Sequence, residues 1–462
     1  MVCNTAVILA AGAGTRMKSS LPKVLHKVCG RPMIEHVINQ VRRSGVEDII
    51  LVVGHGAEGV VSACTELGVR FAVQEEQLGT GHAVMQAREL LPENGDVLIL
   101  CGDTPLITGE GLAGFMEFHR EGANDASVLT AELAEPYGYG RIIRDSRGGL
   151  VKIVEQKDAD ENEKQVREIN SGIFCFNAAI LKSNLTKLKT DNSQNEYYIT
   201  DVLGIAVREG GRTGAYLVAD AADIAGINTR VQLADAERVM RGRIAERHML
   251  AGVTMIDPGA VYLDDTVEIG PDTVLYPGAF LTGKSVVGQG CVIGQNSRIE
   301  DSIIGDGVEV QSSTIIRSSV GDGSSIGPYA YLRPDSRIGK KVKIGDFVEV
   351  KNAIIGDYSK ASHLSYIGDA DVGRNVNIGC GVVFVNYDGK KKYRSTVRDG
   401  AFVGSNCNLV APVVIEENAY VAAGTTVTRN VPNGSLCLGR VKEKHIEGWV
   451  QRKNLLREVK ED

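Results

Sequence analysis

The sequence predicts an α/β protein built from two different kinds of structure. Strands alternate with helices over residues 1–229, and this order is typical of a mostly parallel sheet covered on both faces. From residue 251 to residue 462, aliphatic residues recur every six positions, which is the period of a left-handed parallel β-helix of hexapeptide repeats. A polar stretch with periodic apolar positions over 230–250 predicts a helix that links the two domains.

The first domain begins with an apolar strand over 6–9, followed by a helical pattern that opens at Pro32 and stops at Gly45. Further strands are expected over 48–54, 69–74 and 95–103, with helices between them. Ligands of such sheets bind at the carboxyl ends of the strands. Three segments fall at these ends: Gly12–Arg16, Gly54–His55 and Gly102–Asp103.

After Asp103 the pattern changes to strands that we expect to be partly antiparallel and to form a lid or floor for a second substrate. These strands are expected over 126–133, 140–145, 149–156 and 171–177.

The second domain carries its hexapeptide signal in several runs of aliphatic residues. The positions are Ile269, Leu275, Leu281, Val287, Ile293 and Ile299; Ile326, Leu332, Ile338, Ile344 and Val350; Ile355, Ala361 and Ile367; Val372, Ile378 and Phe384; and Val397, Val403, Leu409, Ile415, Val421 and Val427. Three hexads make one coil, so these side chains should stack inside the solenoid. Residues 385–396 break the composition and should project as a loop, and 441–462 predicts a C-terminal capping helix anchored by Trp449.

Composition limits the possible classes of function. The formal net charge of −7 does not favour binding to nucleic acids or membrane surfaces through charge. No apolar run approaches the roughly 18 residues of a membrane span, and the amino terminus lacks the basic region of a signal peptide. Nine cysteines without a Cys-x-x-Cys pair favour a reducing compartment, so a cytoplasmic protein is expected.

The glycine-rich stretch 9-LAAGAGTRMKSSLPK-23 raises three possible chemistries. A P-loop requires Gly-x-x-x-x-Gly-Lys-Ser/Thr, which is absent, and the dinucleotide fingerprint requires a glycine where Met17 stands. What remains is a backbone that lets phosphates approach closely, with Arg16 and Lys23 supplying positive charge. This combination suits a site where a triphosphate is cleaved and pyrophosphate leaves.

With these residues in place, the first domain resembles the sugar-nucleotide pyrophosphorylases, whose fold is Rossmann-like. The resemblance implies that Arg16 and Lys23 are catalytic, that Asp103 and Asn228 hold Mg²⁺, and that Cys101 stands where relatives can carry tyrosine. Residues Gln74 and 78–83 correspond to the segment that reads uracil. The implied contacts to UTP and the UDP-sugar are Leu9, Ala10, Ala11, Gly12, Gly14, Lys23, Gln74, Gly79, Thr80, Cys101, Gly102, Asp103, Gly140, Glu155, Asn170 and Asn228.

The segment 351–379 with 386-NYDG-389 extends the likeness, so that nearly the whole chain resembles the bifunctional bacterial GlmU family. The resemblance implies two activities: acetylation of glucosamine 1-phosphate by acetyl-CoA, and uridylyl transfer from UTP that yields UDP-N-acetylglucosamine for cell-wall polymers. It makes His363 the general base and implies a homotrimer. It assigns Arg333, Lys351, Tyr366 and Asn377 to the sugar phosphate, and Cys380, Asn386, Tyr387, Ser405, Ala423 and Arg440 to acetyl-CoA.

One part of this assignment follows from spacing alone. Arg333 and Lys351 lie 18 residues apart, which is about one coil of three hexads, so both should project from the same side of the solenoid.

Two other interpretations remain open from the residues. The β-helix of a single-activity nucleotidyltransferase could serve assembly only, because fold alone does not decide function. The chain could also be a non-catalytic scaffold, like the nucleotidyltransferase-like subunits of translation exchange factors. His363 with Arg333 and Lys351 argues against the first alternative, and the intact glycine loop with Lys23 argues against the second.

Overall fold

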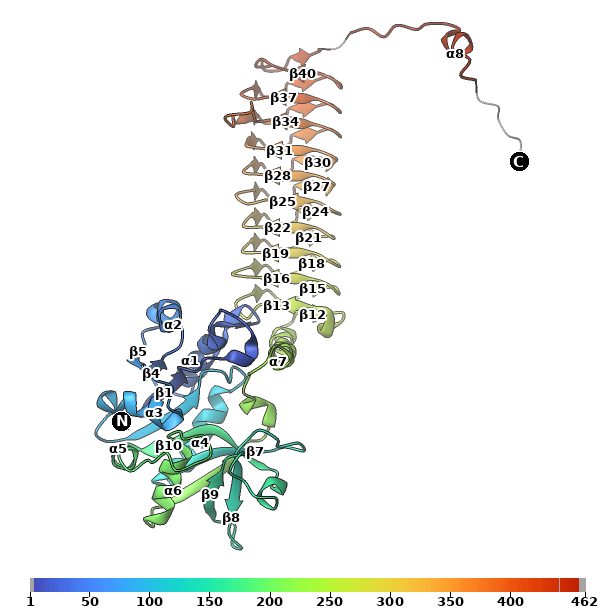
Figure 1. Cartoon of the computed structure of the whole chain (residues 1–462). Coiled ribbons are helices and arrows are strands. Elements are labelled where there is room, and N and C mark those ends of the chain that lie inside the picture. Colours follow the sequence, from blue (N-terminus) through green and yellow to red (C-terminus); the bar gives the residue numbers. More distant parts are fainter. Residues whose placement is uncertain (1–3, 440, 457–462) are drawn as a thin grey trace, which may run out of the picture. The chain divides into compact units, whose positions relative to one another are not determined.

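The computed structural model describes residues 4–439 and 441–456 (Figure 1). The chain divides into two compact units, residues 1–244 and 245–462, with helix α7 (Arg230–Leu250) running across the division. Among the described residues, no helix has the length and apolar character needed to cross a membrane.

The first unit is built on a mixed, mostly parallel sheet in the order β11-β7-β10-β6-β1-β4-β5. Its strands are β1 (Asn4–Ala10), β4 (Asp48–Val53), β5 (Arg70–Val73), β6 (Asp96–Cys101), β7 (Ala126–Glu132), β10 (Glu168–Asn177) and β11 (Thr213–Leu217). Off this path, β8 (Arg141–Arg144) pairs with β10, and β9 (Leu150–Val154) pairs with β8. Strand β10 runs antiparallel to both β6 and β7, as expected for the segments after Asp103.

Helices cover both faces of this sheet because alternate residues of each strand point in opposite directions. In β1, Ala6 and Ile8 join a core with α1 (Met33–Arg43), α2 (Ala57–Cys64) and α4 (Gly109–Glu121). Val7 joins the opposite core with α3 (Thr80–Gln86), α5 (Ala178–Leu185) and α6 (Thr200–Arg208). The predicted α/β class of this domain is confirmed.

The second unit is a parallel β-helix whose short strands form three sheets, and Figure 1 shows its stacked coils. One sheet runs from β12 (Thr254–Met255) to β41 (Leu436–Cys437), a second from β13 (Tyr262–Leu263) to β40 (Thr426–Val427), and a third from β14 (Glu268–Ile269) to β38 (Val414–Ile415). The hexad aliphatics fill its interior; Leu275, Ile293 and Ile344 are each fully buried. The predicted fold of the second domain is therefore confirmed as well.

Coils of this solenoid lie so close together that some positions admit no side chain. A Cβ added at Gly379 would lie 2.7 Å from both the Gly404 carbonyl carbon and the Ser405 nitrogen of the next coil. This close approach explains the glycine that follows so many of the inward-pointing aliphatics.

The projecting loop lies where the sequence predicts it, between β34 (Val383–Val385) and β35 (Ser395–Val397). Ile378 pairs with Val403, 25 positions on, whereas Ala361 pairs with Ile378, 17 positions on, so the loop lengthens one coil. The Tyr393 amide donates to the Asn386 carbonyl at 2.8 Å, which closes the base of the loop.

The capping helix predicted over 441–462 is wrong as a continuous element. In the described part of this segment, the helix α8 spans only Trp449–Arg452, and every side chain there is exposed. Gly448 takes a left-handed conformation (φ 65°) just before it. Charged and apolar residues alternate in this segment, so a helix here would not have its apolar residues along one side. Such a helix would have no apolar face to pack against the rest of the chain.

Candidate functional sites

A cavity of about 300 Å³ opens at the carboxyl ends of β1 and β6 in the first unit. It is lined by Leu9, Ala10, Ala11, Gly12, Lys23, Val24, Gln74, Gln77, Gly79, Thr80, Ala83, Cys101, Asp103 and Glu196. Ten of these residues are among those that the sequence assigns to nucleotide binding. The other four lining residues are Val24, Gln77, Ala83 and Glu196. Ala83 ends the segment 78–83 and Gln77 directly precedes it, whereas Val24 and Glu196 lie outside the motifs described above.

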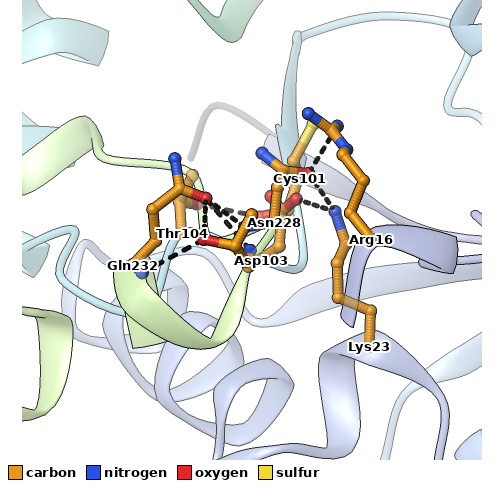
Figure 2. Close-up of polar contacts among 8 residues, drawn as sticks. Arg16, Lys23, Cys101, Asp103, Thr104, Asn228 and Gln232 are labelled. Atoms are coloured by element: carbon orange, nitrogen blue, oxygen red, sulfur yellow. Dashed lines mark hydrogen bonds and ion pairs between the residues drawn. The ribbon is translucent and has the colours of Figure 1, made fainter. Parts of the chain in front are cut away.

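One end of this site is a cluster of charged and amide groups, shown in Figure 2. The ammonium of Lys23 forms an ion pair with Asp103 and donates to Asn228 Oδ1 at 2.9 Å. Arg16 Nη2 donates to the same amide oxygen at 3.0 Å. Four residues that are far apart in the sequence, on the glycine loop, after β6 and before α7, therefore meet at one point.

The backbone holds this cluster in place. The Ile227 amide donates to the Asp103 carbonyl at 2.9 Å, and Gln232 Oε1 accepts from the Asn228 amide at 2.8 Å. Gly14 has φ +59°, and a Cβ there would lie 2.7 Å from Lys23 Cβ. A side chain at position 14 would therefore push Lys23 away from its partners.

The oxygens of Asp103 and Asn228 also fit a divalent cation. Mg²⁺ binds through one or two carboxylate or amide oxygens and takes its other ligands from water and phosphates. Here a single cation, the Lys23 ammonium, already bridges both side chains, so their oxygens lie within reach of one charge centre. Among the described residues no group of three acidic, histidine or cysteine side chains could hold a metal, so the remaining ligands would have to come from the substrate and water.

The other end of the cavity is formed by Gln74 and the start of α3. Gln74 is 3% exposed, and its Nε2 donates to the Gly79 carbonyl at 3.1 Å. The Gly81 amide donates to the Tyr197 carbonyl at 2.7 Å, and Thr80 Oγ1 accepts from the Ile199 amide at 3.1 Å. The segment 78–83 is thus fixed against residues 197–199.

Gly140, Glu155 and Asn170 gather separately, beside β8, β9 and β10. A Cβ at Gly140 would lie 3.4 Å from Asn170 Cβ and 3.5 Å from Glu155 Oε1. Burial, with the nearby carboxylate of Asp158 as a second cause, raises the pKa of Glu155 above its ordinary value. Gly140 thus leaves open space beside two hydrogen-bonding side chains.

Cys101 ends β6 and lines the cavity, half-buried. Burial, followed by the charge of Asp103, raises the pKa of its thiol to about 12. The thiol therefore stays protonated and is a contact surface rather than a nucleophile. Next to it, the Gly102 amide donates to the Leu9 carbonyl at 2.9 Å.

In the second unit, His363 ends β30 (Lys360–His363) and lies beside Asp346, the last residue of β27 (Lys343–Asp346). His363 Nδ1 lies 2.6 Å from Asp346 Oδ1. The hydrogen bond from His363 lowers the pKa of Asp346. A carboxylate accepts only, so Nδ1 carries the proton, and in the neutral imidazole Nε2 has the lone pair that a general base needs.

Basic side chains line the neighbouring sheet. Strand β25 (Tyr331–Leu332) pairs with β28 (Glu349–Lys351), with Leu332 opposite Val350, so Arg333 and Lys351 follow in register as their spacing predicts. Arg333 Nη1 donates to Glu349 Oε1 at 2.8 Å, which raises the pKa of the guanidinium.

Lys392 is a functional candidate that the sequence did not reveal. It lies on the projecting loop, and the adjacent ammonium of Lys351 lowers its pKa. Two ammonium groups held together favour an anion between them. The basic composition of the loop, 390-KKKYR-394, could have pointed to an anion-binding role. It could not show which of the three lysines lies next to Lys351.

The base of the loop is anchored by Asn386, which is buried. Its Nδ2 donates to Asp369 and, at 3.4 Å, to Tyr366 Oη. Asp369 also accepts from Asn352 Nδ2 at 2.6 Å. Tyr387 lies further out, where its hydroxyl donates to the Gly389 carbonyl at 2.7 Å.

The remaining predicted residues form a vertical row at one corner of the solenoid. The Asn406 amide donates to the Cys380 carbonyl at 2.7 Å, and the Gly424 amide donates to the Ser405 carbonyl at 2.9 Å, so Cys380, Ser405 and Ala423 lie in successive coils. Asn377 begins β33 (Asn377–Ile378), just before Cys380. Arg440 lies outside the described residues.

Comparison with known proteins gives matches over both units. Residues 5–229 match the nucleotidyl transferase family, and residues 317–352 match the bacterial transferase hexapeptide (six repeats). The chain is 58% identical over 450 residues to the Bifunctional protein GlmU of Alkaliphilus metalliredigens, covering 97% of this chain and 98% of the relative. Proteins of the same name from Alkaliphilus oremlandii (60% identical, 98% and 99% covered) and Clostridioides difficile (55%, 97% and 98%) are similar over the same extent.

Proposed function

The chain belongs to the family of the bifunctional GlmU proteins, and we propose that it makes UDP-N-acetylglucosamine in two steps at two separate sites. The second unit transfers an acetyl group from acetyl-CoA to glucosamine 1-phosphate. The first unit then transfers a uridylyl group from UTP to N-acetylglucosamine 1-phosphate and releases pyrophosphate. The product is the precursor of peptidoglycan and other cell-wall polymers.

The observation that carries the uridylyl step is the meeting of Lys23, Arg16, Asp103 and Asn228 at the carboxyl ends of the strands. A phosphate oxygen of the sugar attacks the α-phosphorus of UTP in line, and the bond to the pyrophosphate oxygen breaks. No protein nucleophile is required, so catalysis rests on position and charge. Lys23 and Arg16 turn to the phosphates and stabilise the charge that develops there.

Asp103 and Asn228 would hold Mg²⁺, which supplies further neutralisation of phosphate charge when bound. Their two oxygens, already bridged by a cation in this structure, support that assignment. Gly140, Glu155 and Asn170 would contact the sugar, and Gln74 with residues 78–83 the base.

The acetyl step uses the Asp346–His363 pair. His363 Nε2 takes a proton from the sugar ammonium, and the free amine attacks the thioester carbonyl of acetyl-CoA. The carbon–sulfur bond then breaks, the acetyl group stays on nitrogen, and CoA leaves as the thiol with the amine's second proton. Asp346 holds the imidazole in the tautomer that leaves Nε2 unprotonated.

Arg333, Lys351 and Lys392 would bind the sugar phosphate, and Tyr366, Asn377 and Asn386 would contact the sugar and acetyl groups. Cys380, Tyr387, Ser405, Ala423 and Arg440 would contact acetyl-CoA. An assembly module would not need the histidine–carboxylate pair, and this disfavours a β-helix with only a structural role.

We also propose that the protein is a homotrimer in the cytoplasm. The His363 side chain is 57% exposed, so one chain alone does not enclose the acetyl site. Beside it, Tyr329, Phe347 and Leu364 expose apolar surface at one corner, and the first two rings stack with centroids 5.5 Å apart. Light scattering that gives the mass of a single chain would contradict the trimer.

Mass-resolved product analysis tests the two activities. We expect glucosamine 1-phosphate, acetyl-CoA, UTP and Mg²⁺ to give UDP-N-acetylglucosamine and pyrophosphate. Leaving out UTP should stop the reaction at N-acetylglucosamine 1-phosphate, and leaving out acetyl-CoA should leave glucosamine 1-phosphate unacetylated. If no mixture gives an acetylated product, the proposed acetyltransferase activity is contradicted. If no mixture releases pyrophosphate, the proposed uridylyltransferase activity is contradicted.

A further inference from the structure

His82 lies in the first turn of α3, within the segment 78–83 and next to Gln74, and has no individual role in the mechanism above. Its imidazole stacks on Tyr197, with ring centroids 6.1 Å apart and an angle of 28° between the planes. The His82 ring therefore lies between the base-reading segment and the segment that holds it in place.

The orientation of the Gln74 amide can be assigned without ambiguity. One end of this amide lies 3.1 Å from the Gly79 carbonyl oxygen, which can only accept, so that end is the nitrogen, Nε2. The same Nε2 lies 3.1 Å from His82 Nδ1. Both amide protons are thus used inside the protein, and among the described residues no donor contacts Oε1.

This arrangement also fixes the state of His82. Because Gln74 Nε2 donates, His82 Nδ1 must accept, and the imidazole is the neutral tautomer with its proton on Nε2. That proton faces Gln86 Nε2 at 3.1 Å, so the exposed amide of Gln86 must turn its oxygen toward the ring and give up its weak 3.4 Å hydrogen bond to the His82 carbonyl. His82 therefore supports one orientation of the Gln74 amide and opposes the reversed one.

The two orientations differ in which base they accept. With Nε2 held by Gly79 and His82, Gln74 presents an oxygen acceptor to the cavity that it lines. An acceptor suits the N3–H of uracil and faces the N3 lone pair of cytosine unfavourably. A reversed amide would present a donor and would suit cytosine instead.

We propose that His82 is a positioning residue that fixes the amide of Gln74 with its oxygen toward the base, and so selects UTP over CTP. The inference rests on the proposed uridylyltransferase function and deepens it. It requires no contact between His82 and the nucleotide.

The test compares kcat/KM for UTP and for CTP in the full-length protein with N-acetylglucosamine 1-phosphate. His82→Phe keeps an aromatic ring beside Tyr197 but removes the acceptor. His82→Asn is the matched variant, because its side-chain oxygen can accept near the position of Nδ1. Gln86→Ala, in an exposed side chain, is the control for the other ring nitrogen.

We expect His82→Phe to lower the UTP-to-CTP ratio by about five- to tenfold, the size of one hydrogen bond. His82→Asn should restore the ratio to within about twofold of the wild-type value, a difference below the size of one hydrogen bond. A merely structural role would lower both kcat/KM values equally, and that result would overturn the proposal, as would a ratio for His82→Asn equal to that of His82→Phe.

If the phenylalanine variant does not turn over, His82→Ala gives the same comparison with His82→Asn. Failure of the proposed function would show separately, because the wild-type protein would then release no pyrophosphate from UTP.

Discussion

At the residue scale, both sites depend on side chains that hold other side chains. Asp346 lies beside His363 only because of the exact number of residues in that coil. Asp346 and His363 are 17 positions apart, whereas Leu332 and Val350, which precede Arg333 and Lys351, are 18 apart. A search at a fixed spacing of 18 residues identifies Arg333 with Lys351 but not Asp346 with His363. Asp346 could therefore not be identified from the sequence as the partner of His363.

Asp346→Asn tests the orienting role in the acetyl site. An amide at this position can donate to Nδ1 instead of accepting from it, which favours the tautomer that places the proton on Nε2. We expect acetyl transfer to fall by about 10–100-fold, the usual cost of losing such a partner, while uridylyl transfer by the same protein is unchanged. A CoA-release assay that finds wild-type acetyl transfer would exclude the role.

Glu155→Gln tests the half-buried carboxyl that lies beside Gly140. Burial raises the pKa of Glu155 in the folded protein above its ordinary value of 4.5. Folding therefore favours the protonated form, and the wild-type protein loses stability as the pH rises from the unfolded pKa through the folded one. We expect the variant to gain thermal stability relative to wild type across that window, and little below it.

Melting temperatures of both proteins at a series of pH values check this expectation. If the difference in melting temperature between the two proteins does not change with pH, ionisation of the Glu155 carboxyl does not explain the stability difference.

At the element scale, the periodicity predicted the solenoid and its loop because each coil repeats the same inward-pointing positions. The C-terminal capping helix was wrong because 441–462 has no such repeat and, in the described part, no partner surface. The strands after Asp103 were predicted, but not that β10 inserts between β6 and β7, because pairing of distant strands leaves no local pattern.

Replacing residues 387–393 by two glycines tests the projecting loop as an element. The strand pairs Asn377–Phe402 and Val383–Asn408 lie outside the loop, so the melting temperature should change by less than about 3 °C, which corresponds to about 1 kcal/mol for a unit of this size. Loss of Lys392 and Tyr387 should lower acetyl transfer by more than about 100-fold.

The control for the loop is Lys390→Ala, an exposed change at its tip that should leave the rate unaltered. Acetyl transfer by the shortened protein at the wild-type rate would show that the loop takes no part in the site.

At the scale of the whole molecule, the central claim is that one chain carries two independent sites acting in sequence. On this claim, the reaction of the first unit would depend on the glycine loop, Lys23, Asp103 and Asn228. The reaction of the second unit would depend on Asp346, His363, Arg333 and Lys351. A change in one set should therefore leave the other reaction intact, and the intermediate should pass between molecules through solution.

The most direct measurement follows the masses of all sugar phosphates formed from glucosamine 1-phosphate, acetyl-CoA, UTP and Mg²⁺ by two variants, Asp103→Ala and His363→Ala. Asp103→Ala should accumulate N-acetylglucosamine 1-phosphate, with uridylyl transfer lowered about 10²–10³-fold. His363→Ala should leave the amine unacetylated yet convert added N-acetylglucosamine 1-phosphate at the wild-type rate, and a mixture of the two variants should restore UDP-N-acetylglucosamine. If either substitution abolishes both reactions, or the mixture makes no product, the account of two independent sites is contradicted.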